Sequence, residues 1–154
     1  MQFINYFFAS ITSFLGLLIG VMLVKIAPEE QKPLKRYFIL ARRVLLLMIF
    51  IFAMFYYFNN NFYILTLIAY FVFLLFIDYK IKDLLKNSIV VYTFLGILFF
   101  LSSKNANLFA IESSLILLYG MPAASLIYNR QEKVSRLIFY NIGFIIIANL
   151  LFFV

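Results

Sequence analysis

Residues 3–36 read FINYFFASITSFLGLLIGVMLVKIAPEEQKPLKR. The stretch opens on an apolar run, residues 3–26, which exceeds the about 20 residues of helix that cross a bilayer core of about 30 Å. It then turns at Pro28 into a short polar segment that carries Lys32, Lys35 and Arg36. An apolar run followed by a basic turn is typical of a membrane helix that ends at the cytoplasmic surface. This pattern decides the fold, because it recurs along the chain.

Six apolar runs approach or reach the length of a membrane span, and short polar segments separate them. The runs are residues 3–26, 37–58, 62–81, 88–103, 108–128 and 137–154. No separator is long enough for a soluble domain. The sequence therefore predicts a single all-α domain over residues 1–154, a polytopic integral membrane bundle of six transmembrane helices.

The composition requires a lipid environment. Of the 154 residues, 66% are hydrophobic and only 12% are charged, whereas globular domains are about half apolar and about a quarter charged. A chain of this size has too high a ratio of surface to volume to bury so many apolar side chains inside itself. The excess must face lipid.

The cations fall on alternate separators. Of the 13 Lys and Arg residues, 12 flank the first, third and fifth separators, and only Lys104 lies in the fourth. The 12 are Lys25, Lys32, Lys35, Arg36, Arg42, Arg43, Lys80, Lys82, Lys86, Arg130, Lys133 and Arg136. Because short cytoplasmic loops collect Lys and Arg, we expect cytoplasmic basic loops and both termini outside. The net charge of +7 then reflects topology and contact with anionic lipid headgroups, not binding of nucleic acid.

The fifth run contains Glu112, the only acidic residue inside an apolar run rather than at its end, followed by Ser113 and Ser114. In one interpretation the carboxylate reaches the outer interface near Lys104, on a helix capped by Asn107. In the other it is a proton or cation site, because acids within membrane segments tend to face protein interiors or water-filled cavities. The two serines would then supply oxygens.

Two further residues of this run could border such a site. Tyr119 lies seven residues after Glu112, on the same helix face. Pro122 cannot donate a hydrogen bond to the carbonyl of Leu118, so we expect the helix to bend there, either for packing alone or to line a solute cavity.

In the last run Asn141 and Asn149 lie eight residues apart, close to one face. Amides are costly in lipid, so this face should point inward. The two side chains would serve either as packing contacts or as the lining of a polar cavity.

Two patterns concern helix surfaces. Thr12, Gly16 and Gly20 are spaced four apart, which lets helix backbones approach closely, either within the chain or in a dimer.

The second pattern is a basic stripe at positions i, i+3, i+4, i+10 and i+11 of one helix. Its members are Lys32, Lys35, Arg36, Arg42 and Arg43. These side chains could snorkel to anionic lipid, or they could bind a phosphorylated headgroup, an anionic solute or an acidic partner.

Catalysis finds little support in the sequence. The chain lacks cysteine and histidine, and it has no glycine-rich phosphate loop and no serine nucleophile with a base. Asp78 and Asp83 have no further acid near them to complete a metal site. We therefore expect neither an enzyme nor a bound metal or cofactor.

Two function classes remain. The first is a small transporter, channel or substrate-binding membrane component for a small solute or ion, with its path between the fifth and sixth runs. The second is a non-catalytic subunit or scaffold of a larger membrane complex. The partners expected for the chain, besides the lipid bilayer, are further copies in a homo-oligomer or another membrane protein. A lipid-modifying enzyme ranks third.

Overall fold

The computed structural model describes residues 2–57, 61–81, 83–128 and 134–153; for 61–63, 78 and 79 it describes the backbone only. Within these ranges every regular element is a helix and short turns join the helices, which confirms the predicted all-α bundle. The helices are α1 (Phe3–Ile26), α2 (Gln31–Tyr56), α3 (Asn61–Lys80), α4 (Leu84–Ser102), α5 (Ala106–Ile127), α6 (Val134–Asn141) and α7 (Gly143–Phe152).

Five helical stretches among the described residues have the length and hydropathy of membrane spans: α1, α2, α4, α5, and α6 together with α7. The third predicted run forms α3, in which the apolar stretch among the residues with described side chains is Ile64–Ile77. The sixth run is interrupted at Ile142, between α6 and α7, which the sequence did not predict. Helices of this length and composition are compatible with a multi-pass membrane protein.

Two helices begin at caps that shift their predicted ends. The side chain of Asn105 accepts hydrogen bonds from the backbone N–H groups of Asn107 and Leu108, at 3.0 and 3.2 Å. Asn105 is thus the N-cap of α5, and the expectation that Asn107 has this role was wrong. Glu112 consequently lies about 9 Å along the helix from Ala106, deeper than the sequence suggested. Asp83 caps α4 in the same way, accepting from the N–H of Leu85 at 3.0 Å.

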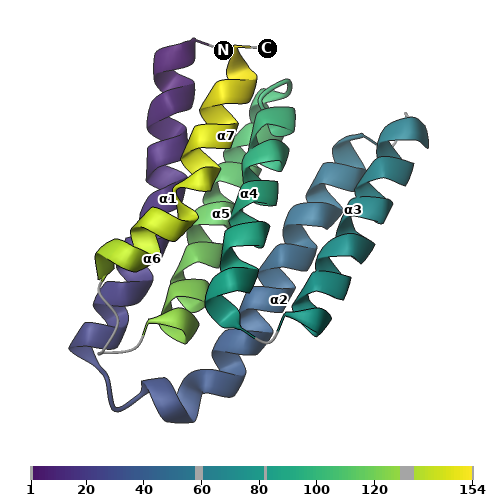
Figure 1. Ribbon diagram of the computed structural model, residues 1–154. Coiled ribbons are helices and arrows are strands. Elements are labelled where there is room, and N and C mark those ends of the chain that lie inside the picture. Colours follow the sequence, from purple (N-terminus) through teal and green to yellow (C-terminus); the bar gives the residue numbers. More distant parts are fainter. Residues whose placement is uncertain (1, 58–60, 82, 129–133, 154) are drawn as a thin grey trace.

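Four spans enclose the core of the bundle (Figure 1). Helix α1 packs on α5, α5 on α4, α4 on α6 and α7, and α7 on α1. Helices α5 and α7 therefore lie diagonally across this four-helix core. Helix α2 packs on the outer side of α5, and α3 packs on α2 and α4, so that these two helices form an outer hairpin.

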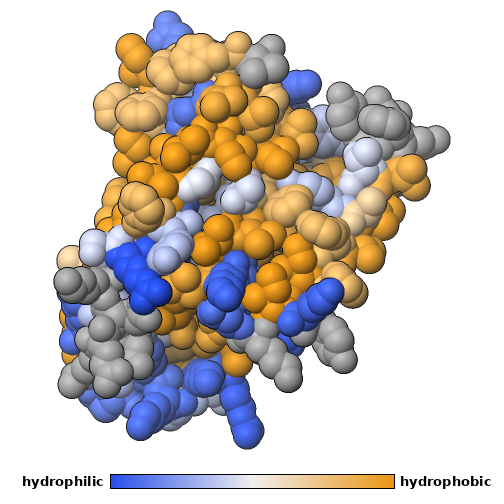
Figure 2. Space-filling view, viewed as in Figure 1, coloured by the Kyte–Doolittle hydropathy of each residue, from blue (hydrophilic) through white to orange (hydrophobic). Residues whose placement is uncertain are grey.

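The two termini lie together at one end of the bundle, and α1, α3 and α5 finish at the other end (Figure 1). Lys25, Lys35 and Lys80 belong to this second end, which we call the basic end. Lys82, Arg130 and Lys133 lie outside the described residues. Figure 2 shows hydrophilic side chains gathered toward the basic end and a broad hydrophobic band above them.

The contact between α1 and α5 is made by backbone rather than by long side chains. A Cβ atom added at Gly16 would overlap the carbonyl oxygen of Leu117, and one added at Gly20 would overlap that of Met121. On the opposite helix, a Cβ added at Gly120 would lie 2.6 Å from the backbone carbonyl carbon of Gly16. Only glycine allows this approach at the three positions.

Hydrogen bonds reinforce the same contact. The hydroxyl of Ser13 donates to the carbonyl of Ser113 at 3.0 Å, and the hydroxyl of Ser125 donates to the carbonyl of Gly20 at 3.3 Å. Thr12 lies exposed, with its hydroxyl bonded within α1. Of the predicted row of small residues, Gly16 and Gly20 thus pack within the chain, while Thr12 stays outside the contact.

We predict that Gly16→Ala lowers stability by about 1–3 kcal/mol, because the added methyl group forces the two backbones apart. Gly143→Ala is the matched control, since its Cβ would meet only the hydroxyl of Thr93, at 3.4 Å. The measurement is the temperature at which each purified variant loses its monodisperse peak in size-exclusion chromatography. Equal temperatures for both variants would contradict the backbone contact.

Candidate functional site: a buried carboxyl in the four-helix core

Glu112 lies in the interior and not at the outer surface of the bundle. Its side chain is 1% exposed, and neither carboxyl oxygen has a hydrogen-bond partner among the described residues. Lys104, the cation considered as its neighbour, is exposed. Burying a polar group without a hydrogen bond costs about 1–3 kcal/mol, and more when the group is charged. The carboxyl therefore weakens the fold at this position.

Aromatic rings of α4 and α5 flank the carboxyl along the helix. Phe109, one turn before Glu112, contacts Phe99 of α4 with ring centroids 4.9 Å apart. Tyr119, two turns after Glu112, contacts Tyr92 of α4 at 5.8 Å. Because positions 109, 112 and 119 share one face of α5, the side chain of Glu112 projects between these two ring pairs.

Helices α7 and α1 complete the aromatic enclosure. The ring of Phe144 lies 5.5 Å from Phe99 and 6.1 Å from Tyr92, so it bridges the two pairs from the opposite side of the core. Phe14 of α1 stacks on Phe144 at 6.3 Å. All four core helices thus contribute rings to a region of low polarity around the carboxyl.

A second polar group in this core is also unsatisfied. Tyr92 is fully buried, and its hydroxyl has no hydrogen-bond partner among the described residues. The hydroxyl of Tyr6, by contrast, donates to the carbonyl of Ala148 at 2.8 Å. Buried polar groups are hydrogen-bonded in the large majority of cases, and the exceptions are candidates for functional groups.

The two predicted asparagines mainly form hydrogen bonds between helices. Asn141 is fully buried, and its side-chain oxygen accepts a hydrogen bond from the hydroxyl of Ser88 on α4 at 2.7 Å. Asn149 donates to the hydroxyl of Ser10 on α1 at 3.1 Å, while its side-chain oxygen has no partner among the described residues. Each asparagine also donates to a carbonyl of its own helix, which fixes its rotamer.

The other predicted residues of the fifth run are placed as follows. The hydroxyls of Ser113 and Ser114 donate to backbone carbonyls one turn earlier, at 2.6 and 2.9 Å. These hydrogen bonds are directed along α5 and not to the carboxyl of Glu112. Pro122 is buried inside an α5 that continues past it to Ile127. The interior of the four-helix core, and not a direct seam between the fifth and sixth spans, is the space that these two spans share.

The basic stripe divides into two parts. Lys32, Lys35, Arg36 and Arg43 are exposed, whereas Arg42 is only 6% exposed. Arg42 and Arg43 line a cavity of about 100 Å³ together with Tyr119.

Sequence reasoning missed Gln31, whose side-chain amide donates to the carbonyls of Ser125 and Tyr128 at 2.8 and 2.7 Å. This side chain ties the start of α2 to the end of α5. Sequence reasoning also missed Tyr92, for which the sequence holds no distinguishing signal among 11 tyrosines.

Among the residues whose side chains are described, no group of three or more acids could hold a metal ion. Asp83 serves as the α4 cap, and the side chain of Asp78 lies outside the description. Neither a known protein family, nor a curated protein, nor a solved structure matches the chain. Its function therefore has to be inferred from its own residues.

We predict that Glu112→Met raises stability by about 1–3 kcal/mol, because it replaces an unsatisfied buried carboxyl by an apolar side chain of similar length. Asn141→Leu should lower stability by a similar amount, since it leaves the hydroxyl of Ser88 without its acceptor. Thermal unfolding of both purified variants, followed by circular dichroism, makes the comparison. A Glu112→Met variant as unstable as Asn141→Leu would show that the carboxyl has a structural role.

Proposed function

We propose that this chain is a small membrane transport or substrate-binding component for a small solute or ion, and that Glu112 takes up a proton or cation. The observation that supports this proposal is the buried, unpartnered carboxyl inside an apolar helical core. An ionisable residue within a membrane segment is expensive to maintain and is usually functional.

The surroundings suit reversible binding of positive charge. An ionised carboxylate is costly in an apolar region unless a proton or a cation compensates its charge. The aromatic rings of the four core helices limit access of water, which strengthens electrostatic interactions at the carboxyl. The hydroxyl of Tyr92, which has no partner among the described residues, is available as a second oxygen in the same core.

A route toward the basic end would follow one face of α5. Tyr119 shares the face of Glu112, contacts Tyr92, and also borders the cavity that Arg42 and Arg43 line. It therefore borders both the four-helix core and this cavity, as Val91 of α4 also does. In the proposed mechanism a rotation of Tyr119 connects Glu112 with the basic end.

We further propose that the basic end is cytoplasmic and that both termini lie outside. The support is the distribution of cations along the sequence, since Lys and Arg accumulate in short cytoplasmic loops.

A non-catalytic subunit of a larger membrane complex is the second candidate. Its support is α3, which packs on the bundle mainly along α2 and α4 and leaves Leu65, Val72 and Phe76 exposed. Such a surface suits lipid and a partner helix equally. This candidate predicts that substitutions of Glu112 have no effect on function.

We predict that Glu112→Gln abolishes cation or proton movement while the variant still folds, because the amide keeps the shape of the side chain but cannot carry the charge. The measurement is flux of protons, Na⁺ and K⁺ into proteoliposomes that hold a trapped indicator dye. Ser114→Ala is the matched control, since its exposed hydroxyl bonds only within α5. Flux that persists in Glu112→Gln, or wild-type flux no greater than in protein-free vesicles, would contradict the proposal.

The orientation can be tested with single cysteines, because the chain has none of its own. We predict that a membrane-impermeant maleimide labels Lys104→Cys on intact cells. Lys86→Cys, near the basic end, should be labelled only after the membrane is permeabilised. The reverse pattern would contradict the proposed topology.

A further inference from the structure

Two cavities lie where the outer hairpin of α2 and α3 meets the core. The first, which we call the arginine cavity, has a volume of about 100 Å³ and lies toward the basic end. Arg42 and Arg43 line it together with apolar side chains of α2 and α3, among them Leu47, Phe71 and Leu75.

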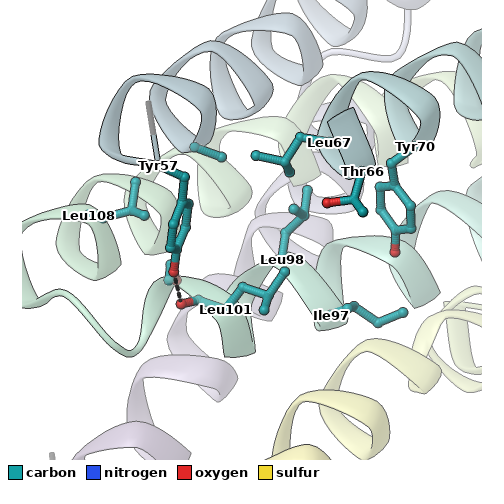
Figure 3. Close-up of a pocket in the computed structure, with 10 residues that line it drawn as sticks. Tyr57, Thr66, Leu67, Tyr70, Ile97, Leu98, Leu101 and Leu108 are labelled. Atoms are coloured by element: carbon teal, nitrogen blue, oxygen red, sulfur yellow. Dashed lines mark hydrogen bonds between the residues drawn. The ribbon is translucent and has the colours of Figure 1, made fainter. Parts of the chain in front are cut away.

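The second, which we call the tyrosine cavity, has a volume of about 140 Å³ and lies farther along the same helices (Figure 3). Leu67 and Leu98 reach into it, and Tyr57 borders it with its hydroxyl donating to the carbonyl of Leu101 at 2.6 Å (Figure 3). Because this hydroxyl is directed to the backbone, the surface that the cavity offers to a ligand is mainly apolar.

We call the line along which α2 and α3 meet the core, from the arginine cavity to the tyrosine cavity, the seam. We propose that the seam binds an anionic phospholipid, with its phosphate against Arg42 and Arg43 and one hydrocarbon chain along α2 and α3 toward the tyrosine cavity. The two cavities are separate, and Phe50 packs on Tyr70 and Phe71 between them, so the hydrocarbon chain would run over the outer side of these rings. From Arg42 at the first cavity to Tyr57 at the second is about 22 Å along α2. This proposal does not depend on the transport function.

The arginine pair provides the headgroup contact. An arginine carries five N–H donors in a planar fork, so it can bind two phosphate oxygens while it keeps a bond within the protein. Arg42 is 6% exposed and thus held within the bundle, unlike the exposed Lys32 and Lys35. A charge-assisted pair of hydrogen bonds from a preformed position is stronger than one from a mobile surface lysine.

The depth of the cavity favours a lipid over a free phosphate ion. Leu75 and Tyr119, which both line the arginine cavity, lie about 8 and 12 Å from the ends of α3 and α5. A phosphate that reaches this level must leave water, and it regains free energy if it brings a chain that fills the apolar part of the seam. A zwitterionic lipid would place a second cation beside the arginines, so the site should prefer an anionic headgroup.

The test is native mass spectrometry of the purified full chain in detergent with four probes. These are phosphatidylglycerol, phosphatidylcholine with the same chains, glycerol phosphate and inorganic phosphate. We expect phosphatidylglycerol to bind about tenfold more tightly than phosphatidylcholine, and Arg42→Gln to remove this difference. Lys35→Gln, which makes the same change of charge on the surface, should keep it.

A second pair of variants leaves both arginines in place. Leu75 is 48% exposed and lines the arginine cavity, whereas its neighbour Phe76 is exposed and does not. Leu75→Trp should fill the path of the chain and lower binding of phosphatidylglycerol about tenfold, while Phe76→Trp should not. This pair remains decisive even if Arg42→Gln fails to fold.

Three results would overturn the proposal. Competition by glycerol phosphate or inorganic phosphate as strong as that by phosphatidylglycerol would make the site one for free anions. If Lys35→Gln lost the preference for phosphatidylglycerol as fully as Arg42→Gln, the preference would arise from surface charge alone. Binding of phosphatidylglycerol by Leu75→Trp as tight as by the wild-type chain would show that no hydrocarbon chain lies in the seam.

Discussion

The close approach of α1 and α5 is the constraint on which the rest of the structure depends. Gly16, Gly20 and Gly120 let the two backbones touch, so the rotation of α5 about its axis is fixed. The face of α5 that carries Gly120 lies roughly a quarter of a turn from Glu112. With that face on α1, the carboxyl has to point into the space shared with α4 and α7. A contact made by three residues without side chains therefore decides where the only buried acid among the described residues is held.

Two kinds of buried polar side chain can then be distinguished. Asn141, Ser88 and Gln31 each have hydrogen-bond partners on another helix, and they hold the bundle together. Glu112 and the hydroxyl of Tyr92 have none among the described residues, although they lie in the same kind of environment. A group that weakens the fold is retained when it has a use other than packing, so the unpartnered carboxyl supports the proposed role of Glu112 in binding.

The sequence predicted the positions of the helices along the chain better than it predicted which helices pack against one another. Length and composition were sufficient to locate the helices, because a bilayer sets the length of a span, but they did not predict the break at Ile142. The same approach identified Glu112, because a carboxyl in an apolar run is conspicuous. It could not identify Tyr92 or the rings around it, since in membrane helices both the lipid-facing and the core-facing sides are apolar and no periodicity separates them. Arg42 was assigned to the surface stripe for a related reason, because helical spacing shows which residues share a face but not which helix covers that face.

The most direct test of the central claim is native mass spectrometry of the chain extracted gently from its own membrane. We predict recovery as a monomer or small homo-oligomer, and a bound cation other than a proton should be absent from Glu112→Gln prepared in the same way. Recovery in a stoichiometric complex with another polypeptide, with no small ligand in either preparation, would contradict the claim and make the chain a structural subunit.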